Sequence, residues 1–399
     1  MLKLREKIGS QWDAERFITR ITTNPSRPLP IREHEALLLK AGGDKCPSGF
    51  RAYFALASEL AAAGVHAPEG QRPVELPCAL SYLADGDVVA VDPRHGDIAV
   101  LYRKCSPFNS LLVTERCNND CLMCSQPPRK ADDHFRVREL LEIIPLIDVN
   151  TKSLVITGGE PTLLVDDLLK VVVACRNFLP CTALLVLSNG RFFSYLSYCR
   201  ALAEIKHPDL MFAVPLYSDL PSQHDFVVQA DGAFDQTLRG IMNLGRWGHK
   251  VEIRTVIHKL NVERLAAFTQ FIVRNLPFVH HVALMGLEIV GHAKANLEAL
   301  WVDPGEYRAA LGQAVSELSL HRIPVSIYNH PLCMLDGEYW PYARQSISDW
   351  KNMFLDVCAC CAARNRCCGF FSSSMVVHSA HVKPIEDSEL LPNAPCFGE

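Results

Sequence analysis

Three closely spaced cysteines constrain this chain more than any other feature. Cys117, Cys121 and Cys124 form a C-x3-C-x2-C pattern within SLLVTERCNNDCLMCSQPPRK, directly after an apolar stretch typical of a β-strand. Three thiolates at this spacing can bind three irons of a cubic [4Fe-4S] cluster and leave the fourth iron without a protein ligand. An open iron can take part in chemistry, whereas a cluster with four cysteine ligands only relays electrons.

A second motif follows about thirty residues later, where Thr157-Gly158-Gly159-Glu160-Pro161 ends the apolar run SLVIT. Together, the cysteine triplet and this GGE turn resemble the radical S-adenosylmethionine (SAM) superfamily. The alternatives are a zinc site and buried thiols. A closed zinc site normally has two pairs of cysteines, and no fourth Cys or His follows promptly here. The resemblance implies a [4Fe-4S] cluster and SAM as cofactors, with reductive cleavage of SAM to a 5′-deoxyadenosyl radical.

Length and charge set the broad class. The chain has 399 residues and a formal net charge of −4, without the basic excess of a surface that binds nucleic acid. The N-terminal segment MLKLREKIGSQWDAERF lacks the apolar core of a signal peptide, and no stretch reaches the ~18 apolar residues of a membrane span. We therefore expect a cytoplasmic protein without a membrane partner, whose 16 cysteines stay reduced and bind metal.

From residue 106 to about residue 329, short β-branched strands alternate with helical patterns. This alternation is typical of a parallel sheet covered by helices, and by itself it also fits an open doubly wound sheet. The resemblance implies a partial (β/α)6 barrel. The helical patterns span 136–147, 166–179, 234–248 and 262–276, with a further helix at 304–321 and a strand at 323–329. The expected barrel strands are Leu111–Thr114, Leu154–Thr157, Leu184–Ser188, Met211–Pro215, Glu252–Ile257 and His281–Met285.

The regions on either side of the barrel have different patterns. Residues 1–105 contain two apparently helical stretches, EHEALLLKAG and FRAYFALASELAAAG, and then turn signals at Asp85-Gly86 and His95-Gly96 that predict a β-hairpin. We expect this mixed α/β region to be structural or to bind a partner. Residues 330–399 form a short cysteine-rich module.

In parallel barrels, active sites lie at the carboxyl ends of the strands, and the resemblance assigns SAM contacts there. It implies that Gly158 and Gly159 let the backbone approach the SAM amino group, and that Glu160 adds negative charge or orients the turn. Met123 stands where the family usually has an aromatic or apolar residue near the adenine. Ser188 and Asn189 correspond to the position that contacts the ribose.

Further candidates follow the later strands. Arg254 can pair with the SAM carboxylate or form a salt bridge within the sheet. Glu288, in GLEIVGHAKAN with Gly286 and Gly291, resembles the segment beside the adenine. The pair His224-Asp225 can face the cavity, although a solvated loop is the preferred interpretation.

A second cysteine pattern lies near the C-terminus. Its spacing, C-x2-C-x5-C, resembles part of the auxiliary-cluster domains of peptide-modifying radical SAM enzymes and implies a second [4Fe-4S] cluster; zinc is the alternative. Cys360 or Cys368 can replace a neighbour in the pattern, and Cys396 can replace the most N-terminal ligand. The proposed ligands are Cys333, Cys358, Cys361 and Cys367.

The combination of motifs resembles, over most of the chain, the C-type radical SAM maturase of the His-Xaa-Ser peptide system. That resemblance implies a ribosomally made precursor peptide, a second radical SAM maturase and a small accessory protein as partners, with a flavodoxin or ferredoxin as reductant. A cross-link or oxidation at His or Ser is the preferred reaction. Two alternatives stay open: a radical SAM enzyme that acts on a small molecule or RNA, and a non-catalytic, cluster-bearing subunit of a maturase complex.

Overall fold

A computed structural model describes residues 3–9, 12–40, 46–61, 67–69, 71–345, 352–375 and 377–389. The chain divides into two compact units. The first comprises residues 1–111, 134–154 and 170–183, and the second comprises residues 112–133, 155–169 and 184–399. The domain boundaries near residues 105 and 329 stay a prediction.

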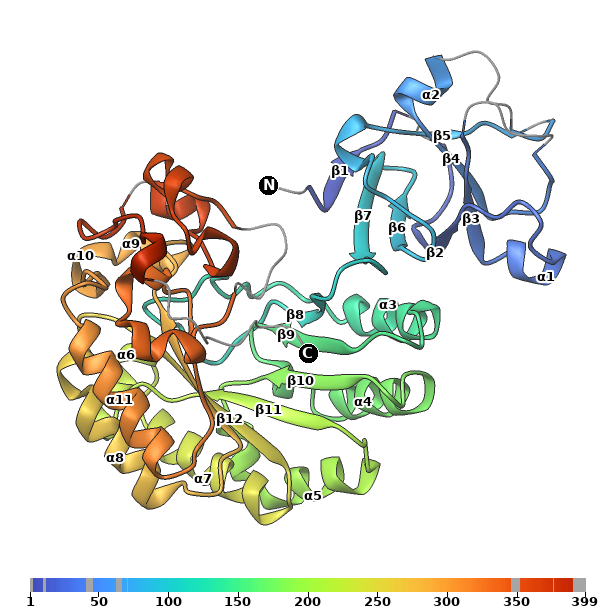
Figure 1. Cartoon of the computed structure of the whole chain (residues 1–399). Helices are drawn as coiled ribbons and strands as arrows, with labels where there is room; N and C mark the ends of the chain where they lie inside the picture. The colour runs from blue at the N-terminus through green and yellow to red at the C-terminus, as the bar shows by residue number, and fades with distance from the viewer. Residues whose placement is uncertain are drawn as a thin grey trace. The chain divides into compact units, whose positions relative to one another are not determined.

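The N-terminal region forms a mixed seven-stranded sheet with the order β1-β7-β6-β2-β3-β4-β5 (Figure 1). The predicted hairpin is present as β6 and β7, which pair antiparallel, and Gly96 takes a positive φ of 60° in the turn between them. The strands are β1 (Arg5–Lys7), β2 (Phe17–Thr22), β3 (Glu35–Leu38), β4 (Ala52–Leu56), β5 (Val74–Leu76), β6 (Val88–Asp92) and β7 (Asp97–Tyr102), with the short helices α1 (Leu29–Arg32) and α2 (Ala57–Ala61).

The two helical stretches expected in this region were largely wrong. EALL forms β3 and AYFAL forms β4, and only Ala57–Ala61 is helical. Both strands are buried over most of their length: the first three residues of β3 and the first four of β4 are buried. A strand that is buried on both faces has a continuous apolar run, which cannot be distinguished from a buried helix by periodicity alone.

Glu35 is the main buried charge of this sheet. It is 1% exposed, and it faces Arg20 on the neighbouring strand β2 in register. Arg20 Nε donates to its Oε1 at 2.9 Å, and Arg27 Nε lies 3.2 Å from its Oε2. Two cations therefore compensate one buried carboxylate, which keeps the cost of its desolvation low.

The second sheet has the order β14-β13-β12-β11-β10-β9-β8, and the four pairs from β10 to β14 are parallel. All six predicted barrel strands are confirmed to within two residues. The strand expected at 323–329 joins the sheet as a seventh member, so the curved sheet is that of a partial barrel. The strands are β8 (Asn109–Thr114), β9 (Ser153–Gly158), β10 (Ala183–Leu187), β11 (Leu210–Pro215), β12 (Lys250–Ile257), β13 (His281–Gly286) and β14 (Val325–Tyr328).

Helices follow the strands, and Figure 1 shows α7, α8 and α11 along the outer side of the curved sheet. The predicted helices are present as α3, α4, α7, α8 and α11, whereas α5 and α6 were not predicted. The helices are α3 (Phe135–Ile143), α4 (Asp166–Phe178), α5 (Leu196–Ile205), α6 (Pro221–Val228), α7 (Ala233–Arg246), α8 (Leu265–Asn275), α9 (His292–Ala295), α10 (Leu297–Leu300) and α11 (Arg308–Leu320). Within the described ranges, none combines the length and apolar character that crossing a bilayer requires.

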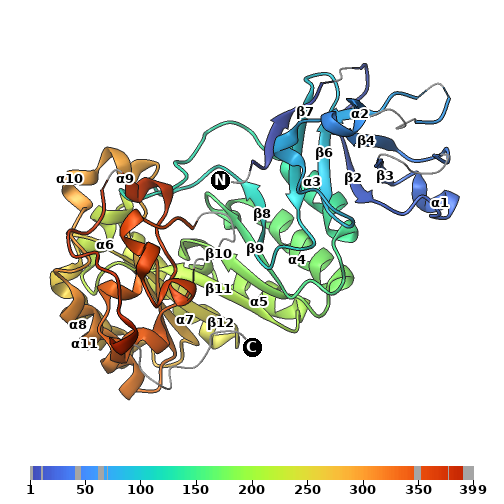
Figure 2. The same ribbon diagram turned by 45° about the horizontal axis from the view of Figure 1, so that its top comes forward.

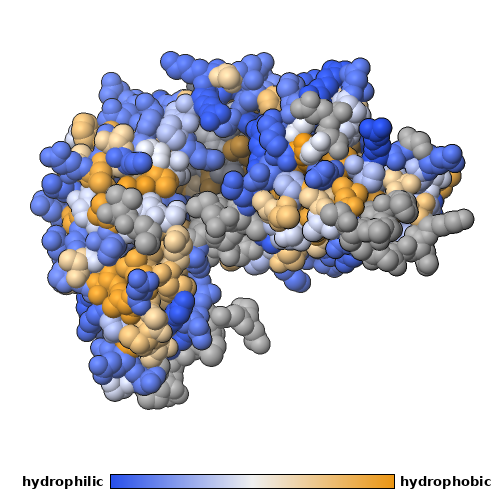
Figure 3. Space-filling view, turned by 90° about the horizontal axis from the view of Figure 1, so that it is seen from above, coloured by the Kyte–Doolittle hydropathy of each residue, from blue (hydrophilic) through white to orange (hydrophobic). Residues whose placement is uncertain are grey.

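The cysteine-rich C-terminal region is built from short 3-10 turns, among them Leu332–Met334 and Asp356–Cys360. Figure 2 shows this region beside α9 and α10. On the face of the molecule in Figure 3, hydrophilic residues predominate, and hydrophobic residues are grouped in a few places.

The Glu35 ion pairs lead to a stability prediction. Glu35→Ala leaves two partly buried arginines without their counter-charge, so we expect the free energy of unfolding to fall by about 2 kcal/mol in urea denaturation. Glu33→Ala, at an exposed position two residues away, is the matched control and should change it by less than about 0.5 kcal/mol. Equal effects of the two substitutions would contradict the role given to Glu35.

Candidate functional site

The three cysteines of the triplet lie together on one loop. We call residues 115–126, directly after β8, the cysteine loop. Burial raises the pKa of Cys117 to about 11 and that of Cys121 to about 12, and it also raises the pKa of Cys124. Cys117 and Cys124 also act electrostatically on Cys121, so the thiols are near neighbours. Because a metal binds the thiolate, metal binding at this loop releases protons.

The cysteine loop already supplies some of the hydrogen bonds that a sulfur ligand needs. The backbone N–H of Asn119 donates to Cys117 Sγ at 3.4 Å, which stabilises a thiolate there. Cys124 Sγ donates its own proton to the carbonyl of Gln126 at 3.0 Å, and this proton leaves when the sulfur binds a metal. The loop is therefore shaped around sulfur atoms that can accept a metal.

The GGE turn lies directly against the cysteine loop. Gly159 N–H donates to Thr114 O and Glu160 N–H donates to Arg116 O, both at 2.8 Å. A Cβ on Gly158 would lie 2.3 Å from Thr114 O, and one on Gly159 would lie 2.2 Å from Arg116 O. The glycines are thus required by the close approach of two chain segments, whereas the sequence predicted close approach to a ligand.

Glu160 is a structural link between strand ends. Its side chain is fully buried and accepts four hydrogen bonds: from Thr162 N (2.9 Å), Thr162 Oγ1 (2.5 Å), Ser188 Oγ (2.8 Å) and Asn189 N (2.6 Å). Burial raises its pKa, and these donors act in the opposite direction. These bonds hold the turn in place, and the charge that Glu160 was expected to add near SAM stays a prediction.

Ser188 and Asn189, at the end of β10, lie beside the cysteine loop. Asn189 Nδ2 donates to Asn118 Oδ1 at 2.6 Å, and its carbonyl accepts from Thr237 Oγ1. Both side chains are buried and already have protein partners. Their contact with a ribose stays a prediction.

Arg191 is an important residue that the sequence analysis missed. Its Nη1 donates to Asn118 O at 2.6 Å and to Asn119 Oδ1 at 2.7 Å, while its Nε donates to Gln236 Oε1 at 2.7 Å. One guanidinium therefore holds the cysteine loop to the end of β10 and to α7. Its position directly after Ser-Asn-Gly, at a strand end, was the available signal.

The end of α6 holds the cysteine loop from a second side. The backbone N–H of Asp120 donates to Val228 O at 3.1 Å, and that of Leu122 donates to Val227 O at 3.0 Å. These two bonds resemble a short strand pairing and fix the middle of the loop.

The segment before and within α9 holds the loop from a third side. His292 N–H donates to Cys124 O at 2.8 Å, and Asn296 Nδ2 donates to Leu122 O at 2.9 Å. Gly291 has a positive φ of 55°, and a Cβ there would lie 2.4 Å from Cys124 O. Gly291, expected beside the adenine, therefore contacts the backbone of the cysteine loop.

Met123 packs inward from the loop. It is 7% exposed and belongs to an apolar cluster with Tyr217 and Val227, against which Leu287 also packs. This gives Met123 a core position under the loop, and its contact with an adenine stays a prediction. Glu288, next to Leu287, is half-buried.

His224 and Asp225 differ from the solvated loop that was expected. Both lie on α6, and His224 is 1% exposed, with its Nδ1 accepting from Tyr217 N–H at 3.3 Å. Burial lowers the pKa of His224 to about 4. Asp225 accepts from the N–H groups of Gly232 and Phe234, both at 2.7 Å, and so orders the start of α7.

His258 follows β12 and is fully buried beside Tyr217, with 6.1 Å between ring centroids. Neither ring nitrogen has a hydrogen-bond partner in the part of the chain that the structure describes. Burial lowers its pKa to about 4, so the ring is neutral at neutral pH.

Arg254 lies in an ion-pair network on β12 to β14. Its Nε donates to Glu252 Oε1 at 2.5 Å, and His281 bridges Glu252 Oε2 (2.7 Å) and Ser326 Oγ (2.9 Å). Burial opposes ionisation of Glu252, but His281 and Arg254 hold its pKa below the ordinary value. The salt bridge that was weighed for Arg254 is therefore present, and a contact with the SAM carboxylate stays a prediction.

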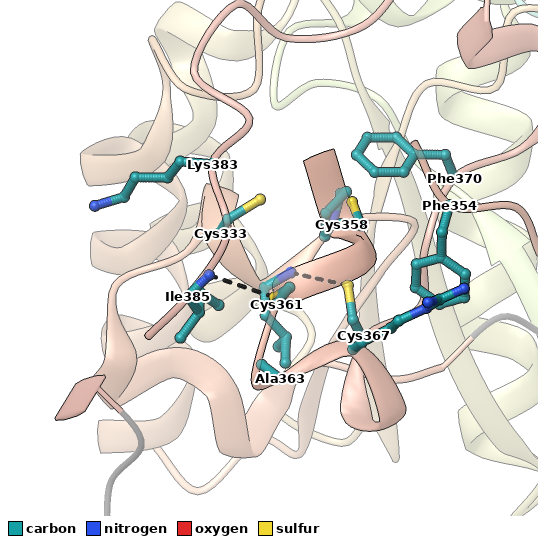
Figure 4. A pocket seen from close by; sticks show the side chains of 12 residues that line it. Cys333, Phe354, Cys358, Cys361, Ala363, Cys367, Phe370, Lys383 and Ile385 are labelled. Carbon is teal, nitrogen blue, oxygen red and sulfur yellow. Dashed lines mark hydrogen bonds between the residues drawn. The ribbon is translucent and has the colours of Figure 1, made fainter. Parts of the chain in front are cut away.

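The four proposed C-terminal ligands line one small cavity. Figure 4 shows the sulfurs of Cys333, Cys358, Cys361 and Cys367 pointing toward a common space. Cys367 Sγ accepts from the N–H groups of Leu332 and Gly369, each at 3.4 Å, and hydrogen bonding with Cys368 lowers its pKa. Cys361 Sγ accepts from Ile385 N–H at 3.4 Å. Such N–H donors stabilise thiolate ligands.

Two of the alternative ligands, Cys360 and Cys368, are described by the structure. Cys360 is exposed and donates to Val357 O, and Cys368 is buried and donates to Gly369 O at 3.3 Å. Neither lines the cavity, and Cys396 lies outside the described residues. Within the described ranges, no three His, Cys, Asp or Glu side chains are close enough to share one metal ion. A cubane instead takes one thiolate per iron, and four cysteines around a cavity suit that arrangement.

Comparison with known proteins places the cysteine loop in a known family. Residues 111–272 match the model of the radical SAM superfamily. No curated protein sequence matches the chain.

Solved structures are similar at low identity. SuiB from Streptococcus suis bound to S-adenosylmethionine has 16% identity and a TM-score of 0.44, over 55% of this chain and 49% of that chain. The structure of anSMEcpe with bound AdoMet has 17% identity and a TM-score of 0.43, over 55% of this chain and 61% of that chain. The coproporphyrinogen III oxidase HemN from Escherichia coli has 11% identity and a TM-score of 0.42, over 53% of this chain and 52% of that chain. Each similarity covers less than two thirds of the other protein.

The contact between the GGE turn and the cysteine loop leads to a prediction about Gly159→Ala. The added Cβ must displace the backbone of Arg116, so we expect the free energy of unfolding to fall by about 1–3 kcal/mol and bound iron to pass to a chelator faster. Gly248→Ala is the control: it also strains the backbone, because Gly248 has a positive φ of 73°, but no atom lies within 4 Å of a Cβ there, so iron release should stay at the wild-type rate. Iron release at the wild-type rate from the Gly159 variant would contradict the proposed role of the contact.

The buried His258 leads to a pH prediction. Its pKa is about 4 in the folded chain and about 6.5 when unfolded, so the unfolded state binds the proton first as pH falls. The stability is fully present above pH 6.5 and is lost toward pH 4. We expect His258→Phe to reduce the slope of unfolding free energy against pH between 6 and 4.5 by about 1 kcal/mol per unit, measured by urea denaturation. An unchanged slope would show that His258 takes up its proton at the same pH in the folded and the unfolded chain, and so that burial does not lower its pKa.

Proposed function

We propose that this chain, whose residues 111–272 belong to the radical SAM superfamily, is an enzyme that modifies a ribosomally made precursor peptide. The observation that carries the proposal is the cysteine loop, in which three neighbouring half-buried cysteines lie on a loop that protein hydrogen bonds hold from three sides. A second set of four cysteines, around its own cavity, distinguishes the chain from a radical SAM domain alone.

In this proposal Cys117, Cys121 and Cys124 would hold a [4Fe-4S] cluster, with SAM bound beside it. With one electron from the reductant, cluster and SAM would supply a 5′-deoxyadenosyl radical that can take a hydrogen atom from the substrate, with methionine as the other product. The role of the protein residues is to hold the cysteine loop in position. The GGE turn and Arg191 fix the cysteine loop, and the apolar cluster of Met123 and Tyr217 closes the space beneath it to water.

The proposed SAM contacts lie around the same strand ends. Gly158, Gly159 and Glu160 would face the amino group, Ser188 and Asn189 the ribose, Arg254 the carboxylate, and Met123 and Glu288 the adenine. The saturated hydrogen bonds of Glu160 favour an indirect role, in which it orients the backbone that SAM contacts.

Cys333, Cys358, Cys361 and Cys367 would hold a second [4Fe-4S] cluster. Four protein ligands leave no iron open, so this cluster would serve electron transfer or peptide anchoring. The N–H donors to Cys361 and Cys367 support thiolate ligands at this site. Iron analysis separates this assignment from a structural zinc site with the same cysteines.

The proposed substrate is a peptide that carries His-Xaa-Ser repeats. This proposal rests on the resemblance of the chain's sequence motifs to those of the C-type radical SAM maturase of the His-Xaa-Ser system. A cross-link or oxidation at His or Ser is the reaction we favour. A second radical SAM maturase and a small accessory protein would act as partners, and a flavodoxin or ferredoxin would supply electrons.

The test begins with anaerobically reconstituted protein. We expect about eight irons in the wild-type chain and about four in either the Cys117/Cys121/Cys124→Ala or the Cys358/Cys361→Ala variant. With SAM and dithionite, the wild-type protein should form 5′-deoxyadenosine, and the first variant should fall to background. Cys181→Ala, which removes an exposed thiol, is the control. No deoxyadenosine from protein that carries full iron would refute an enzymatic role.

A second arm tests the substrate. A synthetic peptide with His-Xaa-Ser repeats is incubated with SAM and reductant, with and without the second maturase, and its mass is measured. A loss of two hydrogens for each cross-link or oxidation is the expected result. Deoxyadenosine formation with no mass change under either condition would contradict this substrate.

A further inference from the structure

A second cavity lies where three barrel strands end. Its walls include Ile257 at the end of β12, Gly286 at the end of β13 and Asn329 after β14. Trp301, Tyr307 and Phe370 add aromatic surface. The carboxyl ends of barrel strands are where substrates bind in parallel α/β barrels.

This cavity adjoins the cavity lined by the four C-terminal cysteines. Pro331 and Phe370 line both of them. Leu287, which lines the strand-end cavity, also packs on the apolar cluster that contains Met123 of the cysteine loop. The strand-end cavity therefore adjoins elements of both proposed cluster sites.

Tyr307 lines this cavity together with the polar side chains of Asn329, Ser374, His378 and Ser379, and its hydroxyl has a defined hydrogen-bond partner. His330 Nδ1 lies 2.9 Å from Tyr328 O, and because a carbonyl only accepts, Nδ1 carries the proton. His330 Nε2 is therefore an acceptor in the neutral ring, and the Tyr307 hydroxyl, 2.8 Å away, donates to it. Tyr307 and His330 are 4% and 1% exposed, so water does not compete for these bonds.

The direction of this bond determines what the cavity can recognise. The hydroxyl proton of Tyr307 is committed to His330, so the phenol oxygen has only acceptor lone pairs left for a ligand. A ligand that brings an N–H or O–H satisfies that oxygen. A ligand without a donor leaves it unpaired in a buried site, which is unfavourable.

We propose that the strand-end cavity binds a side chain of the peptide substrate that has an apolar body and an N–H or O–H at its tip, and that Tyr307 selects it through the acceptor oxygen. The inference rests on the proposed function only for the source of the ligand. Trp301 and Phe370 contact the body of the side chain, and Tyr307 contacts the tip. Imidazole has this combination of a flat ring and an N–H.

The test compares two ligands that differ by one hydrogen-bond donor. 4-Methylimidazole and 1,4-dimethylimidazole, at a pH where both rings are neutral, are titrated into the reconstituted protein by calorimetry, without SAM or reductant. We expect the ligand with the N–H to bind on the order of tenfold more tightly to the wild-type protein. Tyr307→Phe should remove this preference. Val302→Trp, which fills the cavity, should abolish binding of both ligands.

Tyr339→Phe is the matched control. It also removes a phenol hydroxyl, one that bonds Ser316 Oγ at 3.1 Å, but Tyr339 does not line the cavity, so the preference should remain. Equal binding of the two ligands, binding of neither, or a preference that survives Tyr307→Phe would each overturn the proposal. Since no turnover is involved, loss of the donor preference in protein that still forms deoxyadenosine refutes this inference alone. Absence of deoxyadenosine with the preference intact refutes the proposed function instead.

Discussion

The contact between the GGE turn and the cysteine loop sets the geometry on which the rest of the site depends. Two backbone hydrogen bonds of 2.8 Å join the segments, and the approach is so close that neither Gly158 nor Gly159 has room for a Cβ. Main-chain contacts of this kind have few degrees of freedom. The position of the cysteine loop relative to the GGE turn is thus fixed by main-chain contacts.

Polar side chains extend this constraint across neighbouring strand ends. Glu160 joins the turn after β9 to the end of β10, and Arg191 joins the end of β10 to the cysteine loop. Both residues have their hydrogen-bonding groups directed at the protein. A network that is satisfied internally is rigid, and rigidity in the shell around a metal site orients the ligands themselves.

Much of the architecture could be predicted from sequence, because the barrel strands are short, β-branched and separated by clear helical patterns. The N-terminal sheet could not, since the buried strands β3 and β4 have the continuous apolar composition that also suits a helix. In the site, the cysteines were recognisable by spacing. The partners of Gly159, Glu160 and Arg191 were not, because they depend on which segments the folded chain brings together. His224 shows the same limit: its polar neighbours suggested solvent, whereas α6 buries it.

The C-terminal region has one further consequence. Between residues 352 and 389, the described chain has 3-10 turns and an isolated bridge between Met353 and Phe370. It has no α-helix and no β-strand there. In this region the proposed second [4Fe-4S] cluster, bound by four cysteines, would restrain the chain in the way that helices and strands restrain it elsewhere. Phe370 belongs both to this region and to the wall of the strand-end cavity. In the proposed function, the second cluster would therefore have to bind to the C-terminal cysteines first. Only then would the wall of the strand-end cavity that contacts the peptide be complete.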